Sequence, residues 1–148
     1  EEQLRAQLKR LLESQKMTEQ EAECIRIRDI RRFVESGLGQ RMKKAAMKQH
    51  LYREQPFVIQ RNASMLDDGW KNETVLVQGI IDAYFMEEEE IVLVDYKTDR
   101  VRRGQEQKLI DLYHVQLEDY ARALERMTGK RVKEKIIYSF TLQKEILL

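Results

Sequence analysis

The fold of this chain is decided by one stretch, VLVQGIIDAYFM-EEEE-IVLVDYKT, which runs from Val75 to Thr98. Its two apolar runs are joined by a short glutamate segment and have the length and composition of strands that are buried on both faces. A short connection between two such strands predicts an antiparallel hairpin in the core. We therefore expect an α/β domain in which helices cover both sides of the sheet.

The predicted hairpin contains charged residues at positions where a core strand normally has apolar ones. Asp82 lies in the first run, and Asp95 and Lys97 lie in the second. Burying an unpaired carboxylate is costly, so each of these carboxylates needs a partner or a metal. If the glutamate turn is symmetric, Asp82 lies opposite Asp95 with the Cβ atoms about 4.5–5.5 Å apart. Lys97 is two residues beyond Asp95 and therefore shares its face of the sheet.

Two opposed carboxylates and a lysine indicate a specific chemistry. A bound divalent cation would remove the repulsion between the carboxylates, and oxygen ligands favour Mg²⁺ or Mn²⁺. Such a cation can polarise a phosphoryl oxygen and activate water, while the lysine stabilises the developing charge. The pattern therefore indicates phosphodiester hydrolysis. The alternative is a purely structural ion pair between Lys97 and Asp95, and spacing alone does not decide between the two.

Helical periodicity dominates the chain upstream of the sheet. Three helices are predicted: residues 2–13, a helix that starts at the capping box of Thr18 and Glu21 and ends at Gly37, and residues 38–48. We expect residues 1–50 to be a helical N-terminal part, and residues 51–148 to be the core, of one domain.

Further elements surround the hairpin in the expected core. Tyr52–Gln60 is a predicted strand, placed at a sheet edge by Pro56, and residues 62–72 are a predicted loop. Gln105–Met127 is a predicted helix ended by Gly129, and Val132–Leu142 is a predicted final strand. The inner stripe of this long helix is expected to consist of Leu109, Leu112, Tyr113, Leu117, Tyr120 and Leu124.

Composition limits the remaining classes of function. The 148 residues suit one globular domain, and no apolar run is long enough for a membrane span, so no membrane partner is expected. The single Cys24 excludes a disulfide framework and a four-cysteine metal or iron–sulfur site, and a cytoplasmic setting is expected. The net charge of +1 means that any DNA-binding surface must be local. The chain starts at Glu1 and both ends look cut, so we expect a fragment of a longer protein.

Three motifs occur in order along the chain: GIID (Gly79–Asp82), VDYKTD (Val94–Asp99) and QLEDY (Gln116–Tyr120). Together they resemble the RecB-type nuclease family of the PD-(D/E)XK superfamily, over about residues 50 to 140. The resemblance implies a restriction-endonuclease-like mixed sheet flanked by helices and preceded by a helical segment. Within the family, YREQPF (Tyr52–Phe57) and the strand before Asp82 look most like the nuclease domain of AddA-type subunits.

The resemblance implies a metal site for Mg²⁺, or Mn²⁺, held by Asp82, Asp95 and the backbone carbonyl of Tyr96. Members of the family carry a further histidine ligand on an upstream Gly-x-x-x-His helix, which this chain lacks. His50 and His114 do not match it and are expected to be surface or hydrogen-bonded histidines. We expect the missing ligand to lie upstream of the first residue, so that this chain alone binds metal poorly and is inactive.

The resemblance also implies that Lys97 is the catalytic lysine and that Gln116 and Tyr120 line the site. Tyr113, Gln116 and Tyr120 share a helix face, although core packing explains Tyr113 and Tyr120 equally well. Arg100, Arg102 and Arg103 follow the DYKTD strand and are expected to contact phosphates, with a solvated loop as the alternative. Trp70 is a candidate for stacking on a base, or for packing.

The function implied is a metal-dependent DNA exonuclease domain of an ATP-dependent helicase–nuclease that processes double-strand breaks for recombinational repair. DNA and an AddB-type subunit would be its partners, and ATP would bind only in the helicase part, outside this chain. One alternative is an inert module that binds DNA or a partner, against which the intact Asp82, Asp95 and Lys97 argue. Another is a stand-alone exonuclease, against which the cut-looking ends argue.

Overall fold

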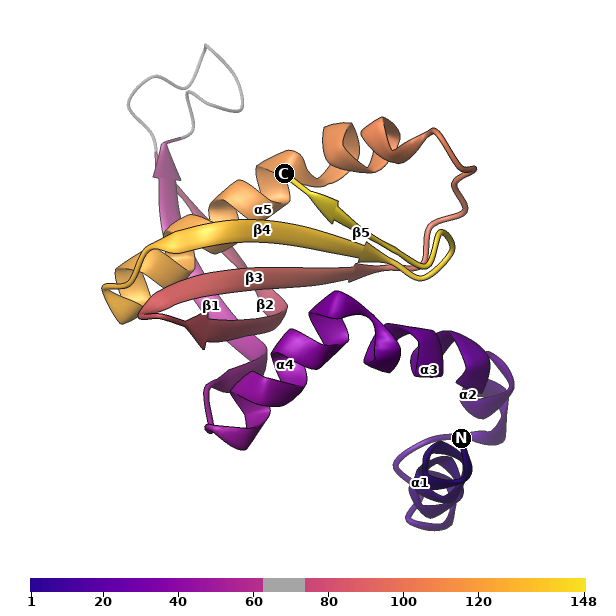
Figure 1. Cartoon of the computed structure of the whole chain (residues 1–148). Coiled ribbons are helices and arrows are strands. Elements are labelled where there is room, and N and C mark those ends of the chain that lie inside the picture. The colour runs from indigo at the N-terminus through magenta and orange to yellow at the C-terminus, as the bar shows by residue number, and fades with distance from the viewer. Residues whose placement is uncertain (63–73) are drawn as a thin grey trace. The chain divides into compact units, whose positions relative to one another are not determined.

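The computed structural model describes residues 1–62 and 74–148, which form a mixed α/β structure (Figure 1). This confirms the predicted fold class. The described residues divide into two compact units, Glu1–Arg41 and Met42–Leu148. Trp70 and nearly all of the predicted loop lie outside the described residues. None of the described helices has the length and apolarity needed to cross a membrane.

The first unit is helical and begins with α1 (Glu2–Glu13), as predicted. The capping box is confirmed at α2 (Glu19–Glu23), where Thr18 Oγ1 accepts from the Glu21 backbone N–H at 3.2 Å. The Glu21 carboxylate in turn accepts from the Thr18 backbone N–H at 2.8 Å. Two donors that the first turn of a helix leaves without a partner are thus satisfied locally.

The single helix predicted after the capping box is wrong in extent, because it ends early and a second helix, α3 (Ile27–Glu35), follows. Arg26 has an extended backbone that separates the two. Gly37 does not end a helix but begins α4 (Gly37–Met47). Ser36 caps α4, because its Oγ accepts from the Gly39 N–H at 3.1 Å. A Cβ on Gly39 would lie 2.1 Å from the Phe33 carbonyl oxygen, so the tight junction requires glycine there.

The second unit is built on a five-stranded sheet whose order follows the chain. Its strands are β1 (Leu51–Asn62), β2 (Thr74–Glu87), β3 (Glu90–Lys97), β4 (Val132–Ser139) and β5 (Lys144–Leu147). Only the β3–β4 pair is parallel, and α5 (Glu106–Thr128) makes the crossover between these two strands. β1 is an edge strand, as Pro56 predicted.

The predicted register of the β2–β3 hairpin is confirmed by the pairing from Glu87↔Glu90 to Ala83↔Val94. The turn residues Glu88 and Glu89 have φ values of 50° and 70°, as the tight turn of a hairpin requires even without glycine or asparagine. The regular ladder ends one pair before Asp82 and Asp95. At this point the Asp82 carboxylate accepts the backbone N–H of Tyr96 at 2.8 Å.

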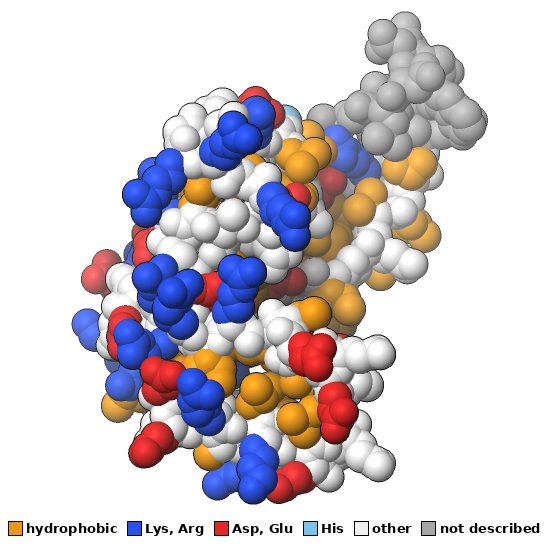
Figure 2. Space-filling view, turned by 90° about the vertical axis from the view of Figure 1, so that its right-hand side faces the viewer, with side chains coloured by type: hydrophobic (Ala, Val, Ile, Leu, Met, Phe, Trp, Pro, Cys, Tyr) orange, Lys and Arg blue, Asp and Glu red, His pale blue; other side chains and the backbone are white. Residues whose placement is uncertain are grey.

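The expectation that β2 is buried on both faces holds only for its second half. From Thr74 to Ile80 exposed and partly buried residues alternate, whereas Ile81, Ala83, Tyr84 and Phe85 are buried. Leu76 and Ile80 are 69% and 58% exposed. Figure 2 shows hydrophobic side chains at the surface of the strands that lead to the grey segment. Helical cover therefore reaches only one face of the outer part of the β1–β2 ribbon.

α5 packs across one face of the sheet, where it contacts β1, β3 and β4 (Figure 1). It ends at Gly129 in the left-handed conformation (φ 68°), as predicted. The predicted inner stripe is correct for Leu109, Leu117, Tyr120 and Leu124, which are buried. It is wrong for Leu112, which is 64% exposed. Ala121 and Ala123 are buried instead, because small side chains let the helix axis approach the sheet closely.

The opposite face of the sheet is contacted by the part of α4 that belongs to the second unit. Met42 and Ala45 are buried there, and the Tyr96 hydroxyl lies 3.7 Å from the Met42 sulfur. Tyr96 neighbours Asp95 on β3, so its ring projects to the other side of the sheet. Helices therefore contact both faces, as expected for strands with two buried sides.

The final strand predicted over Val132–Leu142 is wrong in extent, because β4 ends at Ser139 and a turn leads into β5. Ser139 Oγ accepts the Leu142 N–H at 3.2 Å, and Gln143 reverses the chain with a φ of 53°. β5 then pairs antiparallel with β4. Local side-chain hydrogen bonds thus redirect a run whose composition alone favours a continuous strand.

Candidate active site

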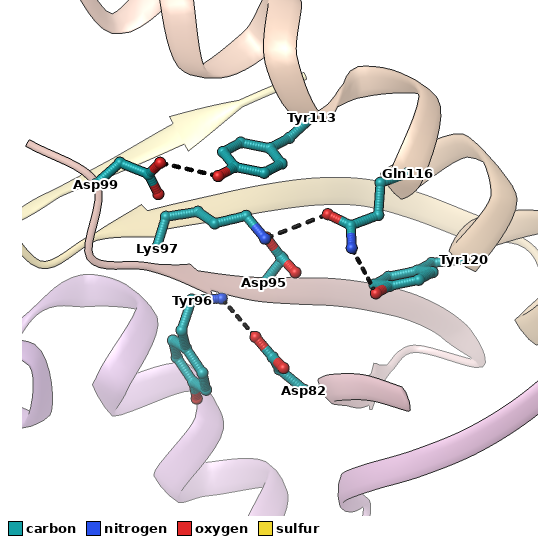
Figure 3. Close-up of polar contacts among 8 residues, drawn as sticks. All are labelled: Asp82, Asp95, Tyr96, Lys97, Asp99, Tyr113, Gln116 and Tyr120. Carbon is teal, nitrogen blue, oxygen red and sulfur yellow. Dashed lines mark hydrogen bonds and ion pairs between the residues drawn. The ribbon is translucent and has the colours of Figure 1, made fainter. Parts of the chain in front are cut away.

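Four of the predicted site residues form one connected set between β3 and α5 (Figure 3). Lys97 Nζ lies 2.7 Å from Asp95 Oδ2 and donates to Gln116 Oε1 at 3.2 Å. Gln116 Nε2 in turn donates to the Tyr120 hydroxyl at 2.7 Å. The alternation of β3 places Asp95 and Lys97 on one face, and the helical spacing of Gln116 and Tyr120 brings both over it.

Asp82 reaches the same region from β2, through the backbone of β3 (Figure 3). Its Oδ2 accepts the Tyr96 N–H at 2.8 Å. In a strand the N–H and C=O of one residue point to the same side, so the Tyr96 carbonyl also faces β2. The Tyr96 side chain, in contrast, is on the other face, where burial raises its pKa to about 12. The backbone of Tyr96, and not its phenol, belongs to the candidate site.

Asp95 is the most unusual charge in the set, because only 2% of its surface is exposed. Burial raises the pKa of its carboxyl above the ordinary value, Lys97 opposes this shift, and the charges of Asp82 and Asp99 add to it. Its Oδ2 is ion-paired with Lys97 but accepts no hydrogen bond of good geometry from the described residues. A buried carboxylate oxygen with unused acceptor capacity is suited to a further cationic ligand.

Two residues without a predicted role also contact this set. Tyr113 donates its hydroxyl hydrogen bond to Asp99 Oδ1 at 2.9 Å, and its ring centroid lies 4.0 Å from Lys97 Nζ. Tyr113 is one turn before Gln116 on α5, and Asp99 ends the DYKTD motif. Their positions in or beside the motifs were therefore visible in the sequence, but their mutual contact depends on the loop between β3 and α5.

The glycine of the GIID motif has a packing role. A Cβ on Gly79 would lie 2.9 Å from Cε1 of Phe57, which occupies the space above it. Phe57 meets Tyr120 edge-on, with ring centroids 5.2 Å apart and an interplanar angle of 70°. Gly79 thus makes room for the ring that supports Tyr120 from β1. Tyr120 combines this packing with the hydrogen bond to Gln116, so both interpretations of this residue apply.

A second ion pair joins β1 to α5 beside the site. Arg61 Nη1 lies 2.8 Å from Asp119 Oδ2, and both side chains are largely buried. The sequence signal for this pair is Asp119 itself, because a carboxylate on the inner face of a helix requires a partner. Arg61 could not be identified as that partner, since it lies 58 residues away in the sequence.

The other candidates stand apart from this set. His50 and His114 are exposed, and His114 Nδ1 lies 3.1 Å from the Asp111 carbonyl oxygen. No group of three or more His, Cys, Asp or Glu side chains suited to a metal occurs within residues 1–62 and 74–148. The arginines expected to contact phosphates are exposed in the loop that follows β3: Arg100, Arg102 and Arg103.

Curated proteins similar to this chain are all described as the same kind of subunit, that of an "ATP-dependent helicase/nuclease". The relative from Clostridium novyi is 38% identical over 98% of this chain, and that from Thermoanaerobacter sp. is 40% identical over 93%. The relative from Acetivibrio thermocellus is 42% identical over 94%. The chain spans only 11–12% of the length of these proteins.

The family model of the PD-(D/E)XK nuclease superfamily matches residues 1–146, which is nearly the whole chain. The match includes the strands and the helix that carry the three motifs. The resemblance seen in the motifs is thereby confirmed, and this chain belongs to the PD-(D/E)XK nuclease superfamily.

Proposed function

We propose that this chain is the nuclease domain of an ATP-dependent helicase–nuclease and that it hydrolyses DNA phosphodiesters with the help of a divalent cation. The observation that carries the proposal is the buried Asp95, ion-paired with Lys97 and hydrogen-bonded through it to α5. A structural ion pair would not need the nearby Asp82, whose charge makes the ionised form of Asp95 less favourable.

The donors around Asp95 fit Mg²⁺ or Mn²⁺. Asp82 and Asp95 supply carboxylate oxygens, and the Tyr96 carbonyl faces the same side as the Asp82 carboxylate. Magnesium is commonly bound by one or two carboxylates, with waters and substrate phosphates as the other ligands, so a site without a third carboxylate is sufficient. When bound, the cation would polarise a phosphoryl oxygen and lower the pKa of a coordinated water.

The chain's own residues then orient the reacting groups. The Lys97 ammonium provides a fixed positive charge beside Asp95 for the charge that develops on a phosphate in the transition state. Gln116 holds this ammonium from α5, and Tyr120 holds Gln116. These contacts reduce the rotamer freedom of a long lysine side chain before substrate arrives. The exposed arginines after β3 would contact the DNA backbone.

The activity of the whole protein is part of the same proposal. The relatives named above are helicase/nuclease subunits, so a longer protein would couple ATP-driven unwinding to cleavage here. We propose that this activity serves recombinational repair of double-strand breaks, with an AddB-type protein as partner and the cytoplasm as location. ATP would bind in the helicase part.

The first test is cleavage of end-labelled single-stranded DNA by this chain with Mg²⁺ or Mn²⁺, beside its Lys97→Ala variant. Loss of one fixed charge that acts in the transition state is expected to lower the rate by about 10²–10³-fold. Lys9→Ala is the matched control, because Lys9 is an exposed lysine on α1. Cleavage that Lys97→Ala retains at the wild-type rate would contradict the role of Lys97.

Metal-dependent cleavage that is absent from the wild-type chain would favour the alternative, an inert nuclease-like module that binds DNA or a partner. Manganese binding separates these outcomes, because the carboxylates can be tested without turnover. We expect Mn²⁺ to bind the wild-type chain and to bind the Asp82→Asn and Asp95→Asn variants at least tenfold more weakly. Equal binding by all three would contradict the proposed ligands.

A further inference from the structure

The ammonium group of Lys97 is surrounded on three sides, and the proposed chemistry uses only two of them. Asp95 Oδ2 and Gln116 Oε1 occupy two sides, at 2.7 and 3.2 Å. The third is the face of the Tyr113 ring, whose centroid is 4.0 Å from Nζ (Figure 3). A cation this close to an aromatic face is attracted by the ring quadrupole, and the attraction grows where water is excluded.

The Tyr113 ring is itself held in place from the opposite element. Its hydroxyl donates to Asp99 Oδ1 at 2.9 Å, and Asp99 follows Lys97 by two residues. Tyr113 precedes Gln116 by three residues, so both project from the same side of α5 toward the ammonium. The contact between Asp99 and Tyr113 thus closes a bridge between the end of β3 and α5 directly over the Lys97 side chain.

We propose that Tyr113 is a positioning residue for Lys97, that its ring face fixes the ammonium beside Asp95, and that Asp99 orients this ring. The catalytic consequence rests on the proposed nuclease function, whereas the contact itself does not. The physical need is clear from the lysine, because four rotatable bonds leave its charge poorly placed unless several groups hold it. The proposal also gives a role to the last residue of the DYKTD motif.

The competing role for an aromatic residue at a nuclease site is stacking on a DNA base. The two roles predict different kinetics. A ring that positions Lys97 acts on the chemical step and changes kcat, whereas a ring that binds a base changes KM and the affinity for DNA. The ring face toward Lys97 is already in contact with the ammonium, and the hydroxyl is bonded to Asp99.

The direct test is nuclear magnetic resonance of the 148-residue chain without metal or DNA. Protons next to an aromatic face are shifted upfield by the ring current, so the Lys97 Hε signals should lie upfield of those of exposed lysines such as Lys9. Tyr113→Leu is expected to abolish this shift, and Tyr113→Phe to keep it. Asp99→Asn retains an acceptor and should preserve most of the shift, whereas Asp99→Ala should reduce it.

The kinetic test uses the same variants in metal-dependent cleavage of single-stranded DNA. Tyr113→Leu is expected to lower kcat by about 3- to 10-fold, the range of a cation–π contact, with KM unchanged. Tyr113→Phe keeps the ring face and should retain most of kcat. Because phenylalanine preserves the packing, its result shows whether a loss in the leucine variant comes from the ring or from misfolding.

The outcomes separate this inference from the proposed function. Unshifted Lys97 signals in the wild-type chain, or a shift that persists in Tyr113→Leu, would overturn the positioning role. A raised KM with unchanged kcat would overturn it in favour of base stacking. If the wild-type chain cleaves no DNA, the nuclease proposal fails for this chain, and the resonance experiment alone decides whether Tyr113 holds Lys97.

Discussion

The two halves of β2 are similar in composition but differ in their surroundings. Thr74–Ile80 is a ribbon whose outward-facing Leu76 and Ile80 are exposed, whereas the apolar residues of the half that follows are buried. Asp82 lies at the boundary and is partly exposed, while Asp95 across the hairpin is buried. The difference teaches that apolar character brings a segment into the sheet, but that cover by other elements decides whether both faces are buried. The candidate site lies where cover ends, which leaves Asp82 accessible.

The largest effect expected from this comparison is on stability. Leu93 on β3 is fully buried beside the covered half of β2, and Leu76 is 69% exposed on the ribbon. Leu93→Ala is expected to lower the free energy of unfolding by about 2–4 kcal/mol, because it leaves a cavity. The same substitution at Leu76 should change it by less than about 0.5 kcal/mol. Urea unfolding of both variants measures the difference, and equal losses would show that the ribbon is covered in solution.

An intermediate effect is expected at Gly79, where the two halves of β2 approach each other. In Gly79→Ala the new Cβ would meet Phe57 at 2.9 Å, and overpacking of this kind typically costs about 1–3 kcal/mol. The displaced Phe57 should also move Tyr120, so cleavage is expected to fall with stability. Gln78→Ala, on the exposed side of the same strand, is the control. A fully stable Gly79→Ala variant would show that Phe57 has room to move.

The smallest effect concerns the charge that the covered region buries. The pKa of Asp95 is raised in the folded chain, chiefly by burial, so the ionised carboxylate favours unfolding relative to the protonated one. Stability from this group is present at low pH and is lost as pH rises through the folded pKa. Asp95→Asn should therefore raise the melting temperature of the metal-free chain at pH 7, by about 2–4 °C. It should also abolish cleavage.

The gain in Asp95→Asn should shrink as pH falls toward 3.8, the ordinary aspartate value, because the wild-type carboxyl is then protonated. Asp111→Asn, at an exposed position of α5, should leave the melting temperature nearly unchanged at every pH. A lower melting temperature for Asp95→Asn at pH 7 would mean that the ion pair with Lys97 outweighs the cost of burial.

Sequence patterns predicted the candidate site better than the fold around it. Asp82, Asp95 and Lys97 were conspicuous because charges are rare in apolar strands, and the structure brings Asp95 and Lys97 together with Gln116 and Tyr120. The errors occur where a local signal has two meanings. Gly37 was expected to end a helix but begins one, and the run after Val132 contains a turn that its composition does not reveal.

The sequence by itself determined the features that depend on near neighbours: the hairpin register, the capping box at Thr18, the end of α5 at Gly129 and the charges within apolar strands. Tertiary structure decided the contacts between distant segments: the partner of Asp119, the bridge from Asp99 to Tyr113 and the half of β2 that is covered. The reason is physical. Hydrogen-bonded turns and side-chain alternation act over a few residues, whereas burial depends on which remote element packs against a surface.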